Sequence, residues 1–162
     1  MHRLASLAVF LLLVVITAAV AGQFVGGEWY QGMTQPSWNP PPIMMASVWA
    51  VIYILMAVSA WMVWDTKRGL ASVALGWWGL QLLFSICWSW MYFGLERIGW
   101  TLAVLSVWIL VVLIVIKTFR SVRTEASSLM IPVVLWLLFF WALNFVQWQL
   151  NGGGIGSIFQ FS

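Results

Sequence analysis

Residues 43–64 read IMMASVWAVIYILMAVSAWMVW, an unbroken apolar stretch without a charged side chain. A helix needs about 20 such residues to cross the hydrocarbon core of a bilayer, which is roughly 30 Å thick. Similar stretches flank it, and the expected spans are residues 4–25, 43–64, 73–95, 100–120 and 129–150. All are helix-length and continuous, unlike the alternating segments of a membrane barrel. The sequence therefore predicts an all-α integral membrane protein, a single domain of five transmembrane helices over residues 1–162.

The overall composition favours lipid as the solvent. Of the 162 residues, 64% are hydrophobic and only 7% are charged, whereas a soluble domain carries about 25% charged residues. A soluble fold of this size could not hide so much apolar surface, because much of any fold faces water. The connections between the expected spans are short, so the sequence predicts a compact bundle without an extramembrane domain.

The first span has a second interpretation. A basic start at Arg3, an apolar run and the small residues 19–21 (Ala-Val-Ala) together resemble a cleavable signal peptide. The hydrophobic region of a signal peptide covers about 7–15 residues, and the run in this chain is longer. We therefore expect residues 4–25 to be retained as a true helix. Cleavage would leave the orientation of the other four spans unchanged.

The basic residues are distributed unevenly between the two sides of this layout. Those on one side are Arg3, Lys67, Arg68, Lys117, Arg120 and Arg123, and only Arg97 falls on the other. Because cytoplasmic loops are enriched in Lys and Arg, we expect a cytoplasmic N-terminus in the inner (plasma) membrane of a bacterium. The net charge of +3 is explained by this topology, so no nucleic-acid partner is expected.

Several kinds of chemistry lack the residues they need. Cys87 is the only cysteine and His2 the only histidine, so haem ligation by two histidines is excluded. The acidic residues all lie in loops or at helix ends: Glu28, Asp65, Glu96 and Glu125. No cluster offers a metal site, and no carboxylate marks a proton pathway within the membrane. The sequence predicts neither a metal nor a bound prosthetic group.

Fourteen tryptophans are the most unusual feature of the composition. Tryptophan commonly forms belts at the membrane surface, and we assign Trp61, Trp64, Trp77, Trp78, Trp100 and Trp148 to such belts. Others lie inside their expected spans: Trp49, Trp88, Trp108, Trp136 and Trp141. For any one of these, packing or lipid contact is the simpler explanation. Whether they line a ligand site therefore depends on the helical faces on which they lie.

Three spans combine aromatic and neutral polar residues on one face. The residues concerned are Trp49 and Tyr53 in the second span; Gln81, Ser85, Trp88, Ser89 and Tyr92 in the third; and Trp136, Phe140, Asn144, Gln147, Trp148 and Asn151 in the fifth. Buried amides need partners, so these faces should point into the bundle. They predict a pocket for a flat apolar ligand. The alternative is a polar network that only holds the helices together.

The connection between the first two spans is rigid. Residues 36–42 read PSWNPPP, and the prolines fix φ while Asn39 is restricted by the proline that follows it. With Trp38 and Asn39 at its centre, this loop could be a lid above the mouth near Trp49, or a plain connector.

A second feature, the small-residue face of Ser72, Gly76 and Gly79 in the third span, permits close helix approach. We expect it to form a homodimer interface, unless it packs within the same chain.

These motifs resemble the tryptophan-rich sensory protein / translocator protein family (TspO/MBR), also called the peripheral-type benzodiazepine receptor family. The most specific element is the loop around Trp38-Asn39-Pro40-Pro41. The other matching pieces, which appear in the same order over nearly the whole chain, are Trp29-Tyr30, Trp49, Tyr53, Gln81-Leu82, Trp88-Ser89, Phe93-Gly94-Leu95, Arg97, Pro132, Trp136, Phe139, Leu143-Asn144, Trp148 and Leu150-Asn151.

The resemblance implies a five-helix bundle, often dimeric, that binds porphyrins such as protoporphyrin IX and related flat hydrophobic ligands. It implies a membrane sensor or translocator, a receptor-like role in tetrapyrrole regulation, transport or stress response. The family's pocket residues match Trp49, Trp136 and Asn144. The full set of expected ligand-binding residues is Trp38, Asn39, Trp49, Tyr53, Ser85, Trp88, Trp136, Phe140 and Asn144.

Two other functions remain open. The first is a light-dependent enzyme that degrades porphyrin with Trp49 and Trp136 as redox-active rings; otherwise no catalytic residue is expected. The second is a small efflux transporter for aromatic compounds, which would need a membrane-embedded carboxylate that this chain lacks.

The chain also departs from the family pattern. Ser85 stands where the family usually has Asn, and Trp90 where it usually has Pro. Phe140 and Trp141 replace small residues and could fill part of the pocket. The cholesterol motif of animal members is not supported, because Phe145 replaces its Tyr and no basic residue follows.

Overall fold

The computed structural model describes residues 2–66 and 69–153 and is helical throughout its regular structure. Its helices are α1 (His2–Gly22), α2 (Glu28–Gly32), α3 (Pro42–Asp65), α4 (Ala71–Ser89), the π-helix η1 (Trp90–Gly94), α5 (Ile98–Val122), α6 (Thr124–Leu129) and α7 (Ile131–Leu150). Five segments are long and apolar enough to cross a membrane. The predicted five-helix bundle is therefore confirmed, and α3 and α5 extend the expected spans by one or two residues at each end.

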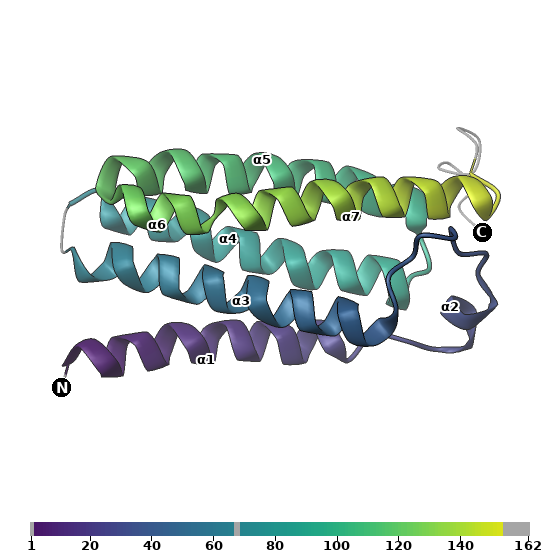
Figure 1. Ribbon diagram of the computed structural model, residues 1–162, viewed down its shortest axis with the longest axis horizontal. Helices are drawn as coiled ribbons and strands as arrows, with labels where there is room; N and C mark the ends of the chain where they lie inside the picture. Colours follow the sequence, from purple (N-terminus) through teal and green to yellow (C-terminus); the bar gives the residue numbers. More distant parts are fainter. Residues whose placement is uncertain (1, 67–68, 154–162) are drawn as a thin grey trace.

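The long helices lie side by side along the longest axis of the molecule (Figure 1). α1 lies at one edge and packs against α3 and α4, while α5 packs against α4 and α7. The N-terminus lies at one end of the bundle, and α2 with its flanking loop lies at the other. Proline occupies the first turn of α3 and of α7, where a missing N–H is tolerated because it would have no partner within the helix.

Three short elements were not expected from the sequence. α2 interrupts the first connection, α6 precedes the last span, and the third span ends in η1 rather than in α-helix. A π-helical turn contains one more residue than an α-helical turn. In η1 the Leu95 N–H donates to the Trp90 carbonyl at 2.9 Å, which is the hydrogen bond of such a turn. Within η1, Tyr92 is buried and Trp90 is exposed, so the turn keeps the polar aromatic face directed into the bundle.

α1 is tied to its neighbours at both ends. At its start the Arg3 guanidinium forms an ion pair with Asp65 at the end of α3, and Nε1 of Trp61 donates to the Arg3 carbonyl at 3.1 Å. Near its end the Ser89 hydroxyl donates to the Ala21 carbonyl at 2.7 Å. These contacts fix where the chain leaves α1 and enters the first loop.

The assignment of Trp78 to a membrane-surface belt is wrong. The side chain is only 3% exposed, and its Nε1 donates to the Met56 carbonyl of α3 at 2.9 Å. Because a belt tryptophan keeps its polar edge at the headgroups, Trp78 is instead a packing residue between α3 and α4.

The small-residue face of α4 points out of the bundle. Ser72 and Gly76 are exposed, and a Cβ added at Gly76 or Gly79 would meet no atom of the described residues within 4 Å. The alternative that this face packs against another described helix of the same chain is therefore wrong.

Candidate functional site

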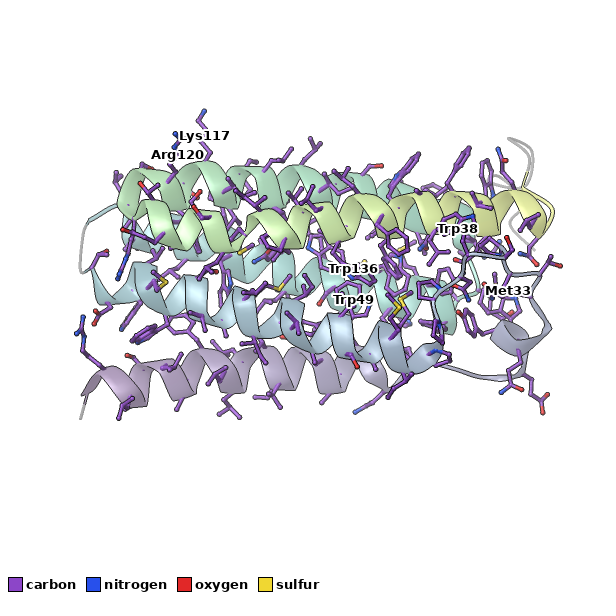
Figure 2. All side chains as sticks on the ribbon, in the orientation of Figure 1. Met33, Trp38, Trp49, Lys117, Arg120 and Trp136 are labelled. Carbon is purple, nitrogen blue, oxygen red and sulfur yellow. The ribbon has the colours of Figure 1, made fainter. Side chains whose placement is uncertain are left out.

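An aromatic cluster around Trp49 occupies the interior between α3, α5 and α7 (Figure 2). The Trp49 ring stacks on Trp108, with centroids 6.1 Å apart and planes at 17°. It meets Trp136 and Phe140 edge-on at 6.1 and 5.3 Å, and it lies 5.9 Å from Tyr53. Three helices thus bring four rings into contact with Trp49, and we call these five residues the Trp49 cluster.

Phe140 is the most enclosed contact of Trp49 on α7. It is only 4% exposed, its ring lies 4.6 Å from Trp88, and it stacks at 15° on Trp136 at 6.3 Å. Its side chain therefore fills the space between the three tryptophans. Trp141, the second bulky departure from the family pattern, points elsewhere, because its Nε1 donates to the Ser106 hydroxyl at 3.1 Å.

The polar residues of the predicted site bond to one another at the edge of the cluster. The Tyr53 hydroxyl donates to Ser85 at 3.3 Å, and Nε1 of Trp88 donates to Oδ1 of Asn144 at 3.3 Å. The Asn144 amide also donates to the Phe140 carbonyl at 2.9 Å. Asn144 thus joins α4 to α7, which supports the network interpretation for this residue.

The loop before α3 is fastened to the end of α7. Asn151 makes two hydrogen bonds of 2.9 Å with the backbone of Thr34, one to the N–H and one to the carbonyl. The Gln147 amide donates to Gln35 at 2.7 Å, and Gln147 in turn accepts from the Tyr92 hydroxyl at 2.8 Å. η1, α7 and the loop are joined by this chain of hydrogen bonds.

Trp38 reaches the cluster through one intermediate ring. It lies 5.8 Å from Phe139, which stacks on Trp136 at 5.1 Å, while nearly half of the Trp38 surface stays exposed. The Asn39 N–H caps a turn by donating to the Pro36 carbonyl at 2.9 Å, and its buried Oδ1 has no partner among the described residues. The loop therefore covers α7 beside the cluster.

Two ring contacts were missing from the predicted set, Trp108 and Phe139. Trp108 is fully buried and stacked on Trp49. The fourth span contains few polar residues, so its sequence gave no indication of which face points inward. The position of Trp108 in the middle of a span nevertheless marked it as a candidate for the interior, because the membrane-surface belt does not account for a tryptophan there.

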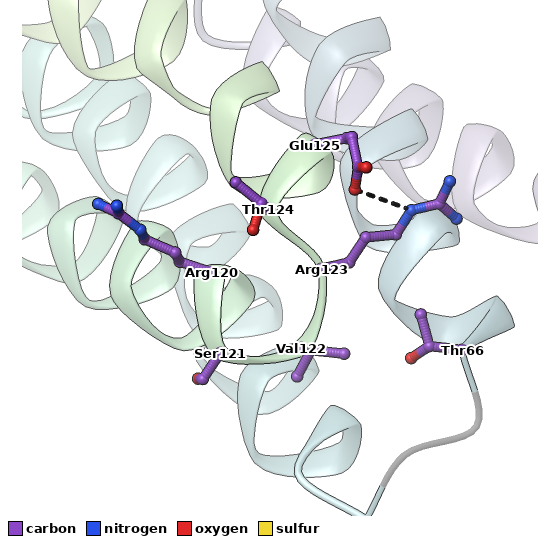
Figure 3. A pocket seen from close by; sticks show the side chains of 7 residues that line it. All are labelled: Thr66, Arg120, Ser121, Val122, Arg123, Thr124 and Glu125. Carbon is purple, nitrogen blue, oxygen red and sulfur yellow. Dashed lines mark ion pairs between the residues drawn. The ribbon is translucent and has the colours of Figure 1, made fainter.

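Two surface pockets lie at the ends of the bundle, away from this cluster. One, of about 400 Å³, is lined at the turn between α5 and α6 by Arg120 and Arg123, among others. Figure 3 shows these guanidinium groups pointing apart, with Arg123 paired to Glu125 at 3.4 Å. The other, of about 420 Å³, lies between α2 and the end of α7 and includes Glu28 and Glu96. Among the described residues no group of three or more side chains could hold a metal ion.

The five apolar helices and the enclosed aromatic site define a multi-pass helical membrane protein. The pattern of the TspO/MBR family matches residues 7–149, and the chain belongs to this family. It is 32% identical over 148 residues to Protein CrtK of Rhodobacter capsulatus, covering 90% of this chain and 92% of that protein. It is also 32% identical over 143 residues to the human translocator protein, covering 85% of each chain. The tryptophan-rich sensory protein of Cereibacter sphaeroides is 32% identical over 124 residues, which are 76% of this chain and 77% of that protein.

Proposed function

We propose that this protein is a membrane sensor or translocator that binds a flat, hydrophobic macrocycle of the protoporphyrin IX class between α3, α5 and α7. The observation that carries the proposal is the contact of Trp49 with four other rings inside a membrane bundle. Relatives named as translocator proteins and as a tryptophan-rich sensory protein support the same role.

The chemistry of the cluster suits such a ligand. Offset stacking on an aromatic ring contributes about 0.5–1.5 kcal/mol beyond the burial of surface, and a macrocycle can contact several rings at once. No charged residue lies within residues 43–64, 73–95 or 131–150. Affinity must therefore come from ring contacts, enclosure and neutral hydrogen bonds.

Access to the cluster requires movement of two parts of the site. Phe140 fills the space that a macrocycle would take, so its side chain must rotate away. The loop around Trp38 must also shift, and it is held by the few side-chain bonds of Asn151 and Gln147. We infer that the loop opens for entry while the helices stay in place.

A titration with protoporphyrin IX tests the proposal. The purified protein, kept in the dark, should quench and shift porphyrin fluorescence with saturable binding. Illumination then separates the two functions: a sensor or translocator leaves the absorption spectrum of bound porphyrin intact, whereas the alternative enzyme bleaches it. A chain that shows no saturable binding in the dark does not have the proposed function.

We further propose that the N-terminus and the α5–α6 turn face the cytoplasm, as the six-to-one distribution of basic residues favours. Single cysteines at Ser37 and Ser128, both exposed, can be introduced in a Cys87→Ser background. An impermeant thiol reagent added to intact cells should label position 37 and leave position 128 unlabelled. The reverse pattern would show the opposite orientation.

The outward face of α4 is proposed as a homodimer interface. Leucine at Gly76 and Gly79 would fill the open space beside both residues and keep two helices from approaching closely. The double variant should therefore shift from dimer to monomer when its mass in detergent is measured by light scattering. A dimer of unchanged mass would place the interface elsewhere, and Gly69→Leu in the neighbouring loop is the matched control.

A further inference from the structure

Three side chains in the core carry buried polar atoms that have no hydrogen-bond partner among the residues that the structure describes. They are Gln81 of α4, Trp108 of α5 and Trp136 of α7. Gln81 and Trp108 are 0% exposed, and both polar atoms of the Gln81 amide are unpaired. Because an unpaired buried donor or acceptor is costly, each such group in a folded protein requires an explanation.

The three side chains lie at one depth in the bundle. α4, α5 and α7 meet where Oδ1 of Asn144 faces Nε1 of Trp88 at 3.3 Å and Oγ1 of Thr101 at 3.5 Å. On each helix the unpaired residue lies two turns from this junction toward the inner end, about 10–12 Å along the axis at 1.5 Å per residue. This depth is close to the middle of all three spans.

Two of these three residues belong to the Trp49 cluster, and the third lies beside it. The rings of Trp108 and Trp136 each lie 6.1 Å from the Trp49 ring. Gln81 lies one turn along α4 from Ser85, whose hydroxyl is bonded to the cluster through a tyrosine. A ligand that replaces the Phe140 side chain beside Trp49 would therefore meet these polar groups at its inner edge.

The chemistry of these groups selects the ligand. An indole N–H can only donate a hydrogen bond, and an amide can donate or accept, so the layer offers mainly donors. An ionised acceptor is disfavoured at this depth because residues 73–95, 98–116 and 131–150 hold no Lys or Arg to pair with it. We propose that Gln81, Trp108 and Trp136 form a polar layer that binds a neutral carbonyl oxygen at the edge of the ligand. This inference rests on the proposed function and adds which chemical group of the ligand the site recognises.

Two porphyrins test the polar layer. Protoporphyrin IX dimethyl ester carries neutral ester carbonyls, whereas etioporphyrin has the same macrocycle with alkyl substituents only. The full-length protein in detergent should bind the ester about five- to tenfold more tightly, as expected for one or two added hydrogen bonds. Gln81→Met should remove most of this preference while the affinity for etioporphyrin stays the same, and Trp108→Phe should weaken the ester more than etioporphyrin.

The outcomes separate this inference from the proposed function. If wild type binds both porphyrins equally, or if Trp108→Phe weakens both by the same factor, the polar layer does not recognise a carbonyl. Trp49→Leu should weaken both porphyrins equally, because it removes a stacking ring and leaves the three residues of the polar layer in place, and it therefore reports on the proposed function alone. If neither porphyrin binds, both proposals fail together.

A ligand-free comparison tests whether the Trp108 N–H is unpaired. Trp78 and Trp108 are both buried, 3% and 0% exposed, but only Trp78 has a partner, the Met56 carbonyl. Trp78→Phe should therefore lower the thermal midpoint more than Trp108→Phe, since only the first substitution removes a hydrogen bond made among the described residues. A larger loss for Trp108→Phe would show that its N–H is satisfied without ligand, which contradicts the inference.

Discussion

Trp49→Leu and Trp136→Leu should each weaken protoporphyrin IX binding about tenfold or more. Each substitution removes a stacking surface worth up to about 1.5 kcal/mol beyond burial, and 1.4 kcal/mol corresponds to a factor of ten in affinity. Leucine keeps an apolar side chain, so the loss reports on the ring. The measurement is the dissociation constant from porphyrin fluorescence. Trp49→Phe and Trp136→Phe retain an aromatic face and should show smaller losses in the same direction.

Trp61 provides the matched control on the same helix as Trp49. It lies about 18 Å further along α3 at 1.5 Å per residue, and its indole N–H donates to the Arg3 carbonyl at the end of the bundle where α1 begins. Trp61→Leu should leave porphyrin affinity unchanged within about twofold. Equal affinities for the Trp49, Trp136 and Trp61 variants would place the site outside the Trp49 cluster.

Phe140→Ala should have opposite effects on stability and on binding. Truncating a buried phenylalanine costs about 3–5 kcal/mol in protein cores, and Phe140 is in contact with three tryptophans. The thermal midpoint of the ligand-free protein should therefore fall. Porphyrin affinity should rise about tenfold, because the ligand no longer has to displace the phenyl ring.

Trp141→Ala separates this effect from general loosening of α7. Trp141 neighbours Phe140 in sequence but bonds Ser106 and stacks on Phe145 at 5.5 Å, away from the cluster. Its removal should leave porphyrin affinity unchanged. If Phe140→Ala instead weakens binding as much as Trp49→Leu, then Phe140 is a wall of the occupied site and does not obstruct it.

The five spans were predictable because each is a continuous apolar stretch, and the cost of unpaired backbone groups in lipid leaves a helix as the available structure. The short elements were not, since α2, η1 and α6 depend on tertiary contacts. In α6, for example, the buried Ser127 donates to the Ile116 carbonyl of α5 at 3.0 Å. Local sequence does not specify such a contact across a turn.

The helical faces that form the candidate site were predictable, but the contacts between residues of different helices were predictable only in part. Helical spacing placed Trp88 and Asn144 toward the interior, and the structure buries both. Periodicity does not say which helices meet, so the bond between these two residues and the stacking of Trp108 on Trp49 were not foreseen. Trp78 was misassigned although it shares the spacing of three and four residues that joins Gln81, Ser85 and Trp88 on one face.

The peripheral position of α1 has a consequence for biosynthesis. α1 is translated before the helices it packs against, α3 and α4, and before Asp65, which pairs with Arg3. Until those helices are inserted, α1 stays in the bilayer as a single span with the charged Arg3 near its first residue. Its docking therefore follows the insertion of α3 and α4.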